Sequence, residues 1–150
     1  MKILAYLCLL VLVGCDPGYH YRFTNAQRSS DGWYRIATGD LEVRTLGLGG
    51  LVHSSWLAPE LEIKNKASDI FIIESVKLST QGRSFTCYFS SDNDIKWRSV
   101  QAGETKRIPI SVDFKESLYK VLGEQIVLEI EYRIGQASPL QAIELNFERE

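Results

Sequence analysis

The sequence predicts an all-β domain in which two antiparallel sheets pack as a β-sandwich. Three observations support this. From Gly32 onward, apolar residues repeatedly alternate with polar ones, as in half-buried strands. Turn-forming residues separate these runs, and only residues 115–122 could form a helix, of about two turns. The chain has 150 residues, 45% of them hydrophobic, which suits a single globular domain.

The segment before Gly32 lacks this regular alternation. Residues 16–31 contain turn and loop formers and show no sustained period, so we interpret them as a flexible tether. Tyr19, Tyr21 and Phe23 do alternate with polar residues, however. An edge strand is therefore the alternative for this part of the segment.

The predicted strands follow from apolar alternation within short runs. They cover residues 33–37, 41–46, 60–64, 70–79, 85–89, 105–114, 125–134 and 140–147. A change of apolar register near Glu74 and Ser75 indicates a β-bulge. Pro109 predicts a sheet edge or a bulge, because proline cannot donate to a strand ladder. The side chains expected to point inward include Phe71, Ile73, Val76, Leu78, Ile108, Ile110, Val112, Phe114, Ile126, Leu128, Ile130, Tyr132, Ile143, Leu145 and Phe147.

The last part of the chain also suggests a type of sandwich. Residues 115–122 would form the short helix, which Gly123 would end. From Leu57 to the end, the order of the strands resembles an immunoglobulin-like sandwich whose last two strands form a terminal hairpin. The resemblance is architectural, because the Cys–Trp–Cys signature of antibody domains is absent.

The first fifteen residues have the character of a signal peptide. Lys2 precedes an apolar run, residues 3–13, which as a helix would span about 16 Å, or roughly half of a bilayer's hydrocarbon core. This length is typical of the apolar part of a signal peptide and too short for a transmembrane helix. A buried N-terminal strand is the less favoured alternative, because the run begins at Met1 and contains no turn signal.

The run ends in Leu12-Val13-Gly14-Cys15. This resembles the lipobox of bacterial lipoproteins, which has Leu, a small or branched residue, Gly or Ala, and then Cys. The resemblance implies cleavage between Gly14 and Cys15 and a diacylglyceryl group on the Cys15 sulfur. Since each buried CH₂ contributes about 0.8 kcal/mol, two or more acyl chains would make a stable membrane anchor. An ordinary secretory signal with an incidental cysteine is the alternative.

These features divide the chain into a signal peptide (1–14), a lipidated cysteine with its tether (15–31) and a β-sandwich domain (32–150). We expect the domain to lie in the bacterial cell envelope, anchored to a membrane and facing the periplasm. Asp16 follows the lipidated cysteine and resembles the signal that retains enterobacterial lipoproteins in the inner membrane. The inner membrane is therefore the location that this rule implies.

The cysteines leave no internal disulfide in the expected mature domain. Cys8 would leave with the signal peptide, and Cys15 would carry the lipid. Cys87 alternates with Phe85 and Phe89, so we predict that it is a buried apolar residue without a reactive role. If Cys15 were not lipidated, a disulfide between Cys15 and Cys87 would be the alternative.

The composition and the polar motifs argue against several functions. A net charge of -2 does not favour nucleic acid as a partner. The residues 47–50, Gly-Leu-Gly-Gly, lack the helix and the Gly-Lys-Ser/Thr of a phosphate loop, so we expect a mobile turn or a bulge. The run 92–94, Asp-Asn-Asp, is followed by Lys96 where a calcium loop needs an oxygen ligand. We expect no cofactor.

Catalysis is also not expected. His53 has neighbouring serines but no nucleophile elbow or orienting acid in sequence, and His20 lies in the expected tether. Glu129 and Glu131 share a strand face on which glutamates usually increase solubility. We therefore predict that the protein is not an enzyme. A small hydrolase that depends on His53 is the remote alternative.

The side chains retained as a candidate protein-binding surface are Trp56, Trp97 and Arg98, because tryptophan and arginine are enriched at binding hot spots. They would lie beside an extended edge within residues 105–114. The alternative is that the tryptophans close the ends of the sandwich as part of the core. The predicted function is a non-catalytic protein-binding or assembly module that binds an unidentified envelope protein. An inhibitor or immunity lipoprotein that protects the envelope from a toxin or lytic enzyme is the main alternative.

Overall fold

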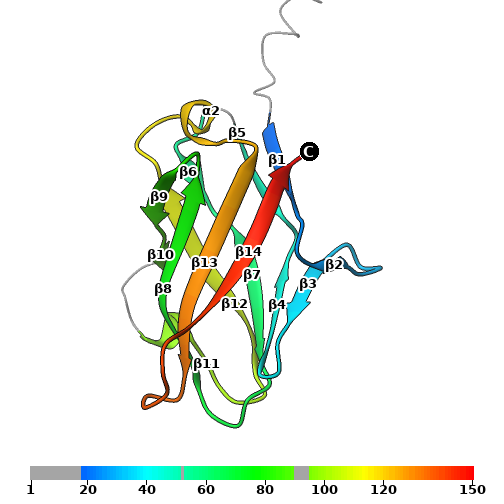
Figure 1. Ribbon diagram of the computed structural model, residues 1–150, viewed down its shortest axis with the longest axis vertical. Coiled ribbons are helices and arrows are strands. Elements are labelled where there is room, and N and C mark those ends of the chain that lie inside the picture. Colours follow the sequence, from blue (N-terminus) through cyan, green and yellow to red (C-terminus); the bar gives the residue numbers. More distant parts are fainter. Residues whose placement is uncertain (1–17, 52, 90–94) are drawn as a thin grey trace, which may run out of the picture.

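The computed structural model describes residues 18–51, 53–89 and 95–150, which form two antiparallel sheets around one apolar core (Figure 1). The strand order of the first sheet is β11, β8, β13, β14, β1, β5, with β9 beside β8. That of the second is β10, β12, β7, β4, β3, β2, with β6 beside β12. The all-β prediction with two antiparallel sheets is confirmed.

The described strands differ in length, and the longest, of nine or ten residues, are β8, β12, β13 and β14. In chain order, the strands are β1 (Gly18–Phe23), β2 (Gln27–Arg28), β3 (Tyr34–Ala37), β4 (Leu41–Thr45), β5 (Leu48–Leu51), β6 (Trp56–Leu57), β7 (Glu60–Asn65), β8 (Phe71–Thr80), β9 (Arg83–Thr86), β10 (Tyr88–Phe89), β11 (Ser99–Val100), β12 (Thr105–Asp113), β13 (Gln125–Ile134) and β14 (Gln141–Arg149). Two helical segments join them, the 3₁₀ turn η1 (Ile95–Trp97) and α2 (Leu118–Val121). The helix predicted at residues 115–122 is thus confirmed in a shorter form, and Gly123 follows it after Leu122.

The period-two pattern correctly predicts which side chains fill the core. All fifteen side chains expected to point inward are buried, with exposures of 8% or less. Phe71 and Phe147 are among the largest, and the Phe147 ring stacks on Phe23 with centroids 5.1 Å apart. Burying a large apolar side chain stabilises a fold by roughly 1.5–3 kcal/mol. Phe23 also contacts the ring of Tyr34 in β3, with centroids 6.3 Å apart, which joins the first sheet to the second.

Two finer predictions about the strands are confirmed. Between β8 and β13, Ser75 pairs with Glu131 and Ile73 with Tyr132, so Glu74 is the additional residue of a bulge. Pro109 lies where β12 has no partner on one side among the described strands, which agrees with the predicted sheet edge. In each case the local irregularity is visible in the sequence, because it changes the alternation or removes a backbone donor.

The prediction of a tether over residues 15–31 is wrong for the described part of that segment. Gly18–Phe23 is β1, which pairs with β14 on one side and β5 on the other. Tyr19, Tyr21 and Phe23 are buried, so the aromatic alternation is that of a strand. The edge-strand alternative correctly predicts a strand, but β1 lies inside the sheet.

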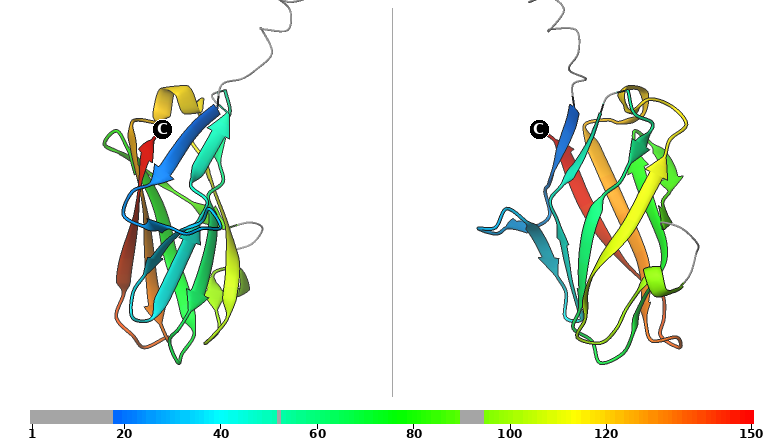
Figure 2. Two further views of the ribbon diagram at one scale, coloured as in Figure 1. Left: turned by 90° about the vertical axis from the view of Figure 1, so that its right-hand side faces the viewer. Right: turned by 180° about the vertical axis from the view of Figure 1, so that it is seen from behind.

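At two short links the chain passes from one sheet to the other (Figure 2). β4 belongs to the second sheet, and β5, which follows it after Leu46 and Gly47, belongs to the first. In the opposite direction, β9 pairs in the first sheet and β10 in the second, with Cys87 between them. Residues 48–50 of the Gly-Leu-Gly-Gly run lie in β5, so they form a strand and not a mobile turn.

Several predictions concern residues outside the described part of the chain. These are the signal peptide, the lipobox with Gly14 and Cys15, the retention signal at Asp16, and the run 92–94. No helix among the described residues is long and apolar enough to span a membrane.

Candidate functional site

Trp97, one of the predicted binding residues, lines an open groove on the second sheet. The groove has a volume of about 570 Å³. Its other lining residues come from 58–61, which are the link from β6 to β7 and the first two residues of β7, and from 107–111 of β12. Pro109 and Ala58 contribute to a lining with few charged groups. The groove is therefore suited to apolar side chains.

Among the described residues, part of the backbone of β12 has no strand partner on one side of this groove. At one end of the strand, the Asn65 N–H donates to the Glu104 carbonyl (3.0 Å), and at the other, the Phe114 N–H donates to the Ser55 carbonyl (2.9 Å). The backbone N–H and C=O groups of successive residues in a strand point to opposite sides. Those of the even-numbered residues between Glu104 and Phe114 therefore face β7 and β6. The odd-numbered residues from Thr105 to Pro109 face away.

The described strand on that second side is β10, and its register partners are Ile110 and Ser111. In the described part of the chain, no strand pairs with residues 105–109 on this side. The nitrogen of Pro109 faces the side of β12 away from β7. The lack of an N–H at this residue therefore removes no hydrogen bond between β12 and β7. Within the described ranges, residues 105–109 thus form the predicted extended edge, beside the groove.

The structure brings Trp97, but neither Trp56 nor Arg98, into the groove lining. Trp56 pairs with Asp113, further along β12 toward α2. The Arg98 guanidinium donates to the Ile73 carbonyl (3.4 Å), which ties this residue to β8 of the first sheet. Partner binding by these residues stays a prediction, but they do not form one pocket.

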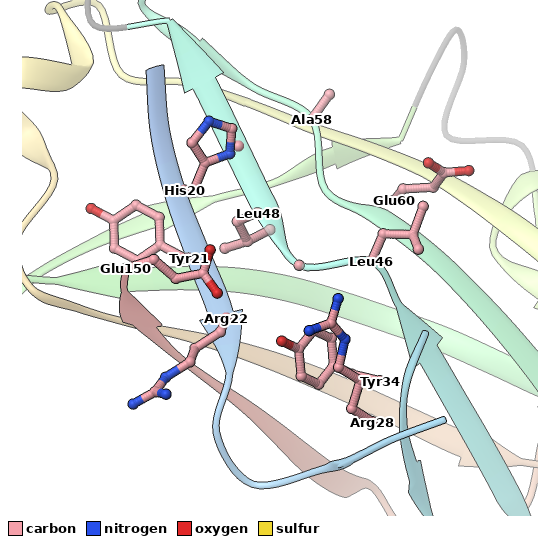
Figure 3. Close-up of a pocket in the computed structure, with 12 residues that line it drawn as sticks. His20, Tyr21, Arg22, Arg28, Tyr34, Leu46, Leu48, Ala58, Glu60 and Glu150 are labelled. Carbon is pink, nitrogen blue, oxygen red and sulfur yellow. The ribbon is translucent and has the colours of Figure 1, made fainter. Parts of the chain in front are cut away.

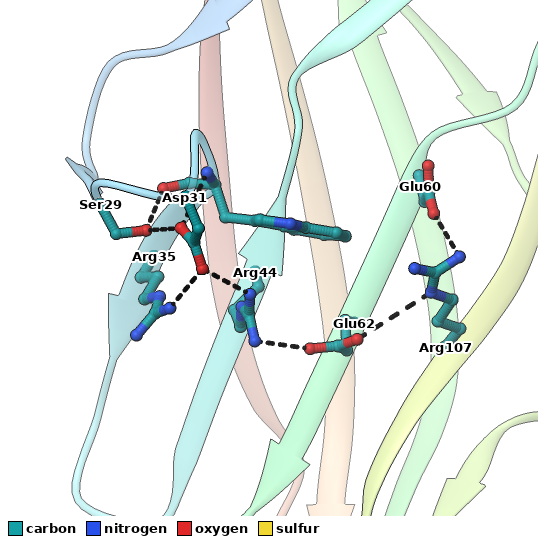
Figure 4. A network of polar contacts seen from close by, with 8 residues as sticks. Ser29, Asp31, Arg35, Arg44, Glu60, Glu62 and Arg107 are labelled. Atoms are coloured by element: carbon teal, nitrogen blue, oxygen red, sulfur yellow. Dashed lines mark hydrogen bonds and ion pairs between the residues drawn. The ribbon is translucent and has the colours of Figure 1, made fainter.

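A row of charged side chains crosses the outer face of the second sheet (Figure 4). Arg35, Arg44, Glu62 and Arg107 are successive register neighbours on β3, β4, β7 and β12. The Glu62 carboxylate lies 3.0 Å from Arg44 and 3.9 Å from Arg107. Asp31 accepts from Arg35 (2.9 Å) and Arg44 (3.2 Å). The row therefore holds its arginines between carboxylates.

The same row positions the two charged side chains that line the groove, Arg107 and Glu60. Arg107 lies 2.8 Å from the Glu60 carboxylate, and its guanidinium is 5.9 Å from the centroid of the Trp33 ring. Trp33 also packs on Arg44, at 4.8 Å. At the far end, the hydrogen bond from Ser29 is the main reason that the pKa of Asp31 is lowered to about 2. The sequence pattern did not predict this ion network or the position of Trp33 against its arginines.

A second pocket, of about 320 Å³, lies where β4 continues into β5 (Figure 3). Its charged lining consists of His20, Arg22, Arg28, Glu60 and Glu150, all exposed. These basic and acidic side chains are mixed, and neither sign dominates the lining. The pocket therefore offers no concentrated charge that would select an anion or a cation.

The other polar residues considered for chemistry lie apart. His53 is exposed in the turn between β5 and β6, whereas His20 lies in β1. Glu129 and Glu131 share Lys77 of β8, whose Nζ is 3.8 and 3.5 Å from their carboxylates. Among the described residues, no group of three or more His, Cys, Asp or Glu is placed to hold a metal ion.

Cys87 is buried between the two sheets, with 4% of its surface exposed, and burial raises the pKa of its thiol to about 12. In a chain with Cys8→Ser and Cys15→Ser, which leaves Cys87 as its thiol, we predict that the folded protein does not react with a thiol reagent at pH 8, whereas the unfolded protein reacts fully. The rate of reaction with dithiobisnitrobenzoate, with and without denaturant, tests this. Rapid labelling of the folded protein would contradict it.

The same pKa predicts a loss of stability in alkali. The unfolded thiol ionises near 9 and the folded one near 12, so the stabilisation is complete below pH 9 and decreases above it. Between pH 9 and 10.5 the free energy of unfolding should fall by about 2 kcal/mol from this group. Cys87→Ala should have a shallower alkaline decline in urea titrations; an unchanged slope would assign the decline to other groups.

Comparisons with known proteins support the architecture. No protein-family model matches the chain, and no curated protein matches it. The chain is similar to the crystal structure of a functionally unknown protein from Listeria monocytogenes EGD-e, with a TM-score of 0.56 and 12% identity over 85% of this chain and 87% of that chain. At this identity the likeness shows the fold alone: an all-β domain of two antiparallel sheets.

Proposed function

We propose that this protein is a bacterial envelope lipoprotein whose immunoglobulin-like sandwich is a non-catalytic protein-binding or assembly module. The anchor is a lipid on Cys15, and the support for it is the run Leu12-Val13-Gly14-Cys15 behind an apolar segment. The first described strand, β1, begins at Gly18, three residues after Cys15. A lipid there would hold the domain close to the membrane surface, facing the periplasm.

The observation that carries the binding role is the groove beside the open edge of β12. An unpaired strand edge offers backbone donors and acceptors to an extended peptide, and an adjacent pocket selects its side chains. Here the edge is residues 105–109, which no described strand pairs on this side, and Trp97 and Pro109 provide apolar contact area. Arg107, which is 66% exposed on its side chain, can hydrogen-bond to a partner while Glu60 holds it in position.

Metabolic labelling tests the anchor. Cells that express the wild-type chain and are grown with a clickable palmitate analogue should yield a labelled protein in the membrane fraction. Cys15→Ser should remove the label and prevent cleavage after Gly14, since the cysteine is required for both steps in the lipoprotein pathway that the lipobox implies. An unlabelled wild-type protein would refute the anchor.

Site-specific photo-crosslinking tests the groove. A photoreactive side chain at Ser111, in the groove lining, should give one discrete crosslinked product in intact cells. Trp97→Ala should reduce its yield by about tenfold or more, as expected for a hot-spot tryptophan. The matched control is the same photoreactive group at the exposed Leu140. Equal products at both positions, or no effect of Trp97→Ala, would contradict a binding role of the groove.

A further inference from the structure

The large aromatic side chains that are exposed in the described part of the chain lie around the last residues of β12. They are Trp56 (55% exposed), Tyr88 (61%) and Tyr119 (68%). The remaining large exposed apolar residues of that part, Leu46, Ile95 and Leu140, are aliphatic. We call the three aromatic residues the aromatic end.

Backbone contacts hold the members of the aromatic end around the last residues of β12. Trp56 pairs with Asp113, and Tyr88 pairs with Ser111. Tyr119 lies in α2, the segment that begins next to the β5–β6 turn, where the Leu118 N–H donates to the Ser54 carbonyl (2.8 Å). The three rings therefore come from β6, β10 and α2, which are separate in sequence and adjacent in the fold.

The N-terminus of the described domain lies at the same end. Figure 1 shows the start of β1 beside β5 and α2, at the top of the molecule. Gly18 pairs with Leu51, which leads through the β5–β6 turn to Trp56. Cys15 precedes Gly18 by three residues, so it lies within about 10 Å of the start of β1 even if this link is fully extended.

The chemistry of the aromatic end fits the surface of a bilayer. Tryptophan and tyrosine combine an apolar ring with an N–H or O–H group, and they are enriched where a membrane's hydrocarbon meets its headgroups. Lys115 and Lys120 flank the rings and are exposed. Their long apolar stems can lie along the same interface while the ammonium groups stay in water.

Charge attraction should contribute less to binding of the aromatic end to the bilayer than burial of the rings does. The Lys115 ammonium is paired with Asp113, and Arg83 lies 2.9 Å from the Glu116 carboxylate. Pairing of these cations reduces the attraction to anionic lipid. Contact with the bilayer should therefore persist at high salt and with zwitterionic lipid.

We propose that the aromatic end, Trp56, Tyr88 and Tyr119, rests in the headgroup region of the bilayer that holds the lipid on Cys15. This inference builds on the proposed lipid anchor and adds an orientation to it. The end of the sandwich that carries α2 and the start of β1 then lies next to the membrane. The segment η1, which carries Trp97, lies nearer the other end of the sandwich in Figure 1, and the groove extends from Trp97 to Ser111, the register partner of Tyr88.

Tryptophan quenching in vesicles tests the orientation. The full-length chain is produced in cells as the lipoprotein and reconstituted into vesicles of phosphatidylcholine brominated near the headgroup end of its acyl chains. Trp33→Phe with Trp97→Phe leaves Trp56 as the probe. Trp33→Phe with Trp56→Phe leaves Trp97 as the matched control. We expect bromine to reduce the Trp56 emission by about half and to leave the Trp97 emission nearly unchanged.

Flotation of the same samples separates the two proposals. A protein that does not float with the vesicles refutes the lipid anchor, and the orientation with it. A protein that floats while Trp56 is quenched no more than Trp97 keeps the anchor and overturns the orientation, which would assign the aromatic end to a protein partner. Tyr119→Trp in a chain without the three native tryptophans provides a second probe, on α2, with the same expected quenching.

Discussion

Replacing Asn65 by alanine is expected to lower the free energy of unfolding by about 3 kcal/mol. Asn65 is fully buried at the end of β7. Its carboxamide N–H groups donate to the carbonyls of Asp69 (2.8 Å) and Val100 (3.0 Å), and its carboxamide oxygen accepts from the Ala67 N–H (3.0 Å). Alanine would remove three hydrogen bonds and leave their backbone partners inside the protein.

The position of Asn65 explains why water cannot easily replace these bonds. Val100 lies in β11 of the first sheet, whereas β7 belongs to the second, so the side chain links the two sheets at one end of the sandwich. The same side chain organises the turn at residues 66–69 that leads into β8. A substitution would therefore loosen the turn and the contact between the sheets together.

Urea unfolding followed by circular dichroism measures this effect. Asn65→Asp keeps the size of the side chain but removes both donors and places a carboxylate against two carbonyls, so it should destabilise at least as strongly at neutral pH. The control is Asn25→Ala, at an exposed residue with a similar bonding pattern, to Glu144 and Asn146. If both alanine variants lost the same stability, the burial argument would fail.

The strands could be predicted because the alternation of apolar and polar residues within each strand shows which of its faces is buried. In β13, alternate residues from Ile126 to Tyr132 are buried, as the pattern requires. The bulge at Glu74 and the open side at Pro109 are also local, since one shifts the alternation and the other lacks an N–H. No knowledge of the neighbouring strand was needed for any of these.

The positions of strands relative to each other could not be predicted in this way. β1 carries an aromatic alternation, but its partner β14 lies at the other end of the sequence, so the segment looked like a tether. Trp56 and Trp97 were both assigned to loops near an edge. The sequence does not say which loops share one end of the sandwich, and the structure places only Trp97 in the groove. Asn65 resembled an ordinary residue before a turn.

Gly47→Ala is expected to destabilise the fold by about 3 kcal/mol. Gly47 is the point at which β4 of the second sheet becomes β5 of the first, and its φ of +104° is rarely adopted by residues with a side chain. A Cβ atom there would lie 2.6 Å from the backbone oxygen of Tyr21. That oxygen belongs to β1, which pairs with β5, so it cannot move without disturbing the ladder.

Two matched glycines separate the conformational cost from the steric one. Gly82 has a φ of +72° but open space around it, so Gly82→Ala should cost about 1 kcal/mol through backbone strain alone. Gly39 has open space and no positive φ, so Gly39→Ala should be nearly neutral. The excess for Gly47→Ala over Gly82→Ala in urea unfolding then measures how tightly β1 is held against the switch between sheets. An excess near zero would mean that β1 moves aside, and the domain could not then hold its N-terminus, and any lipid attached there, in a fixed direction.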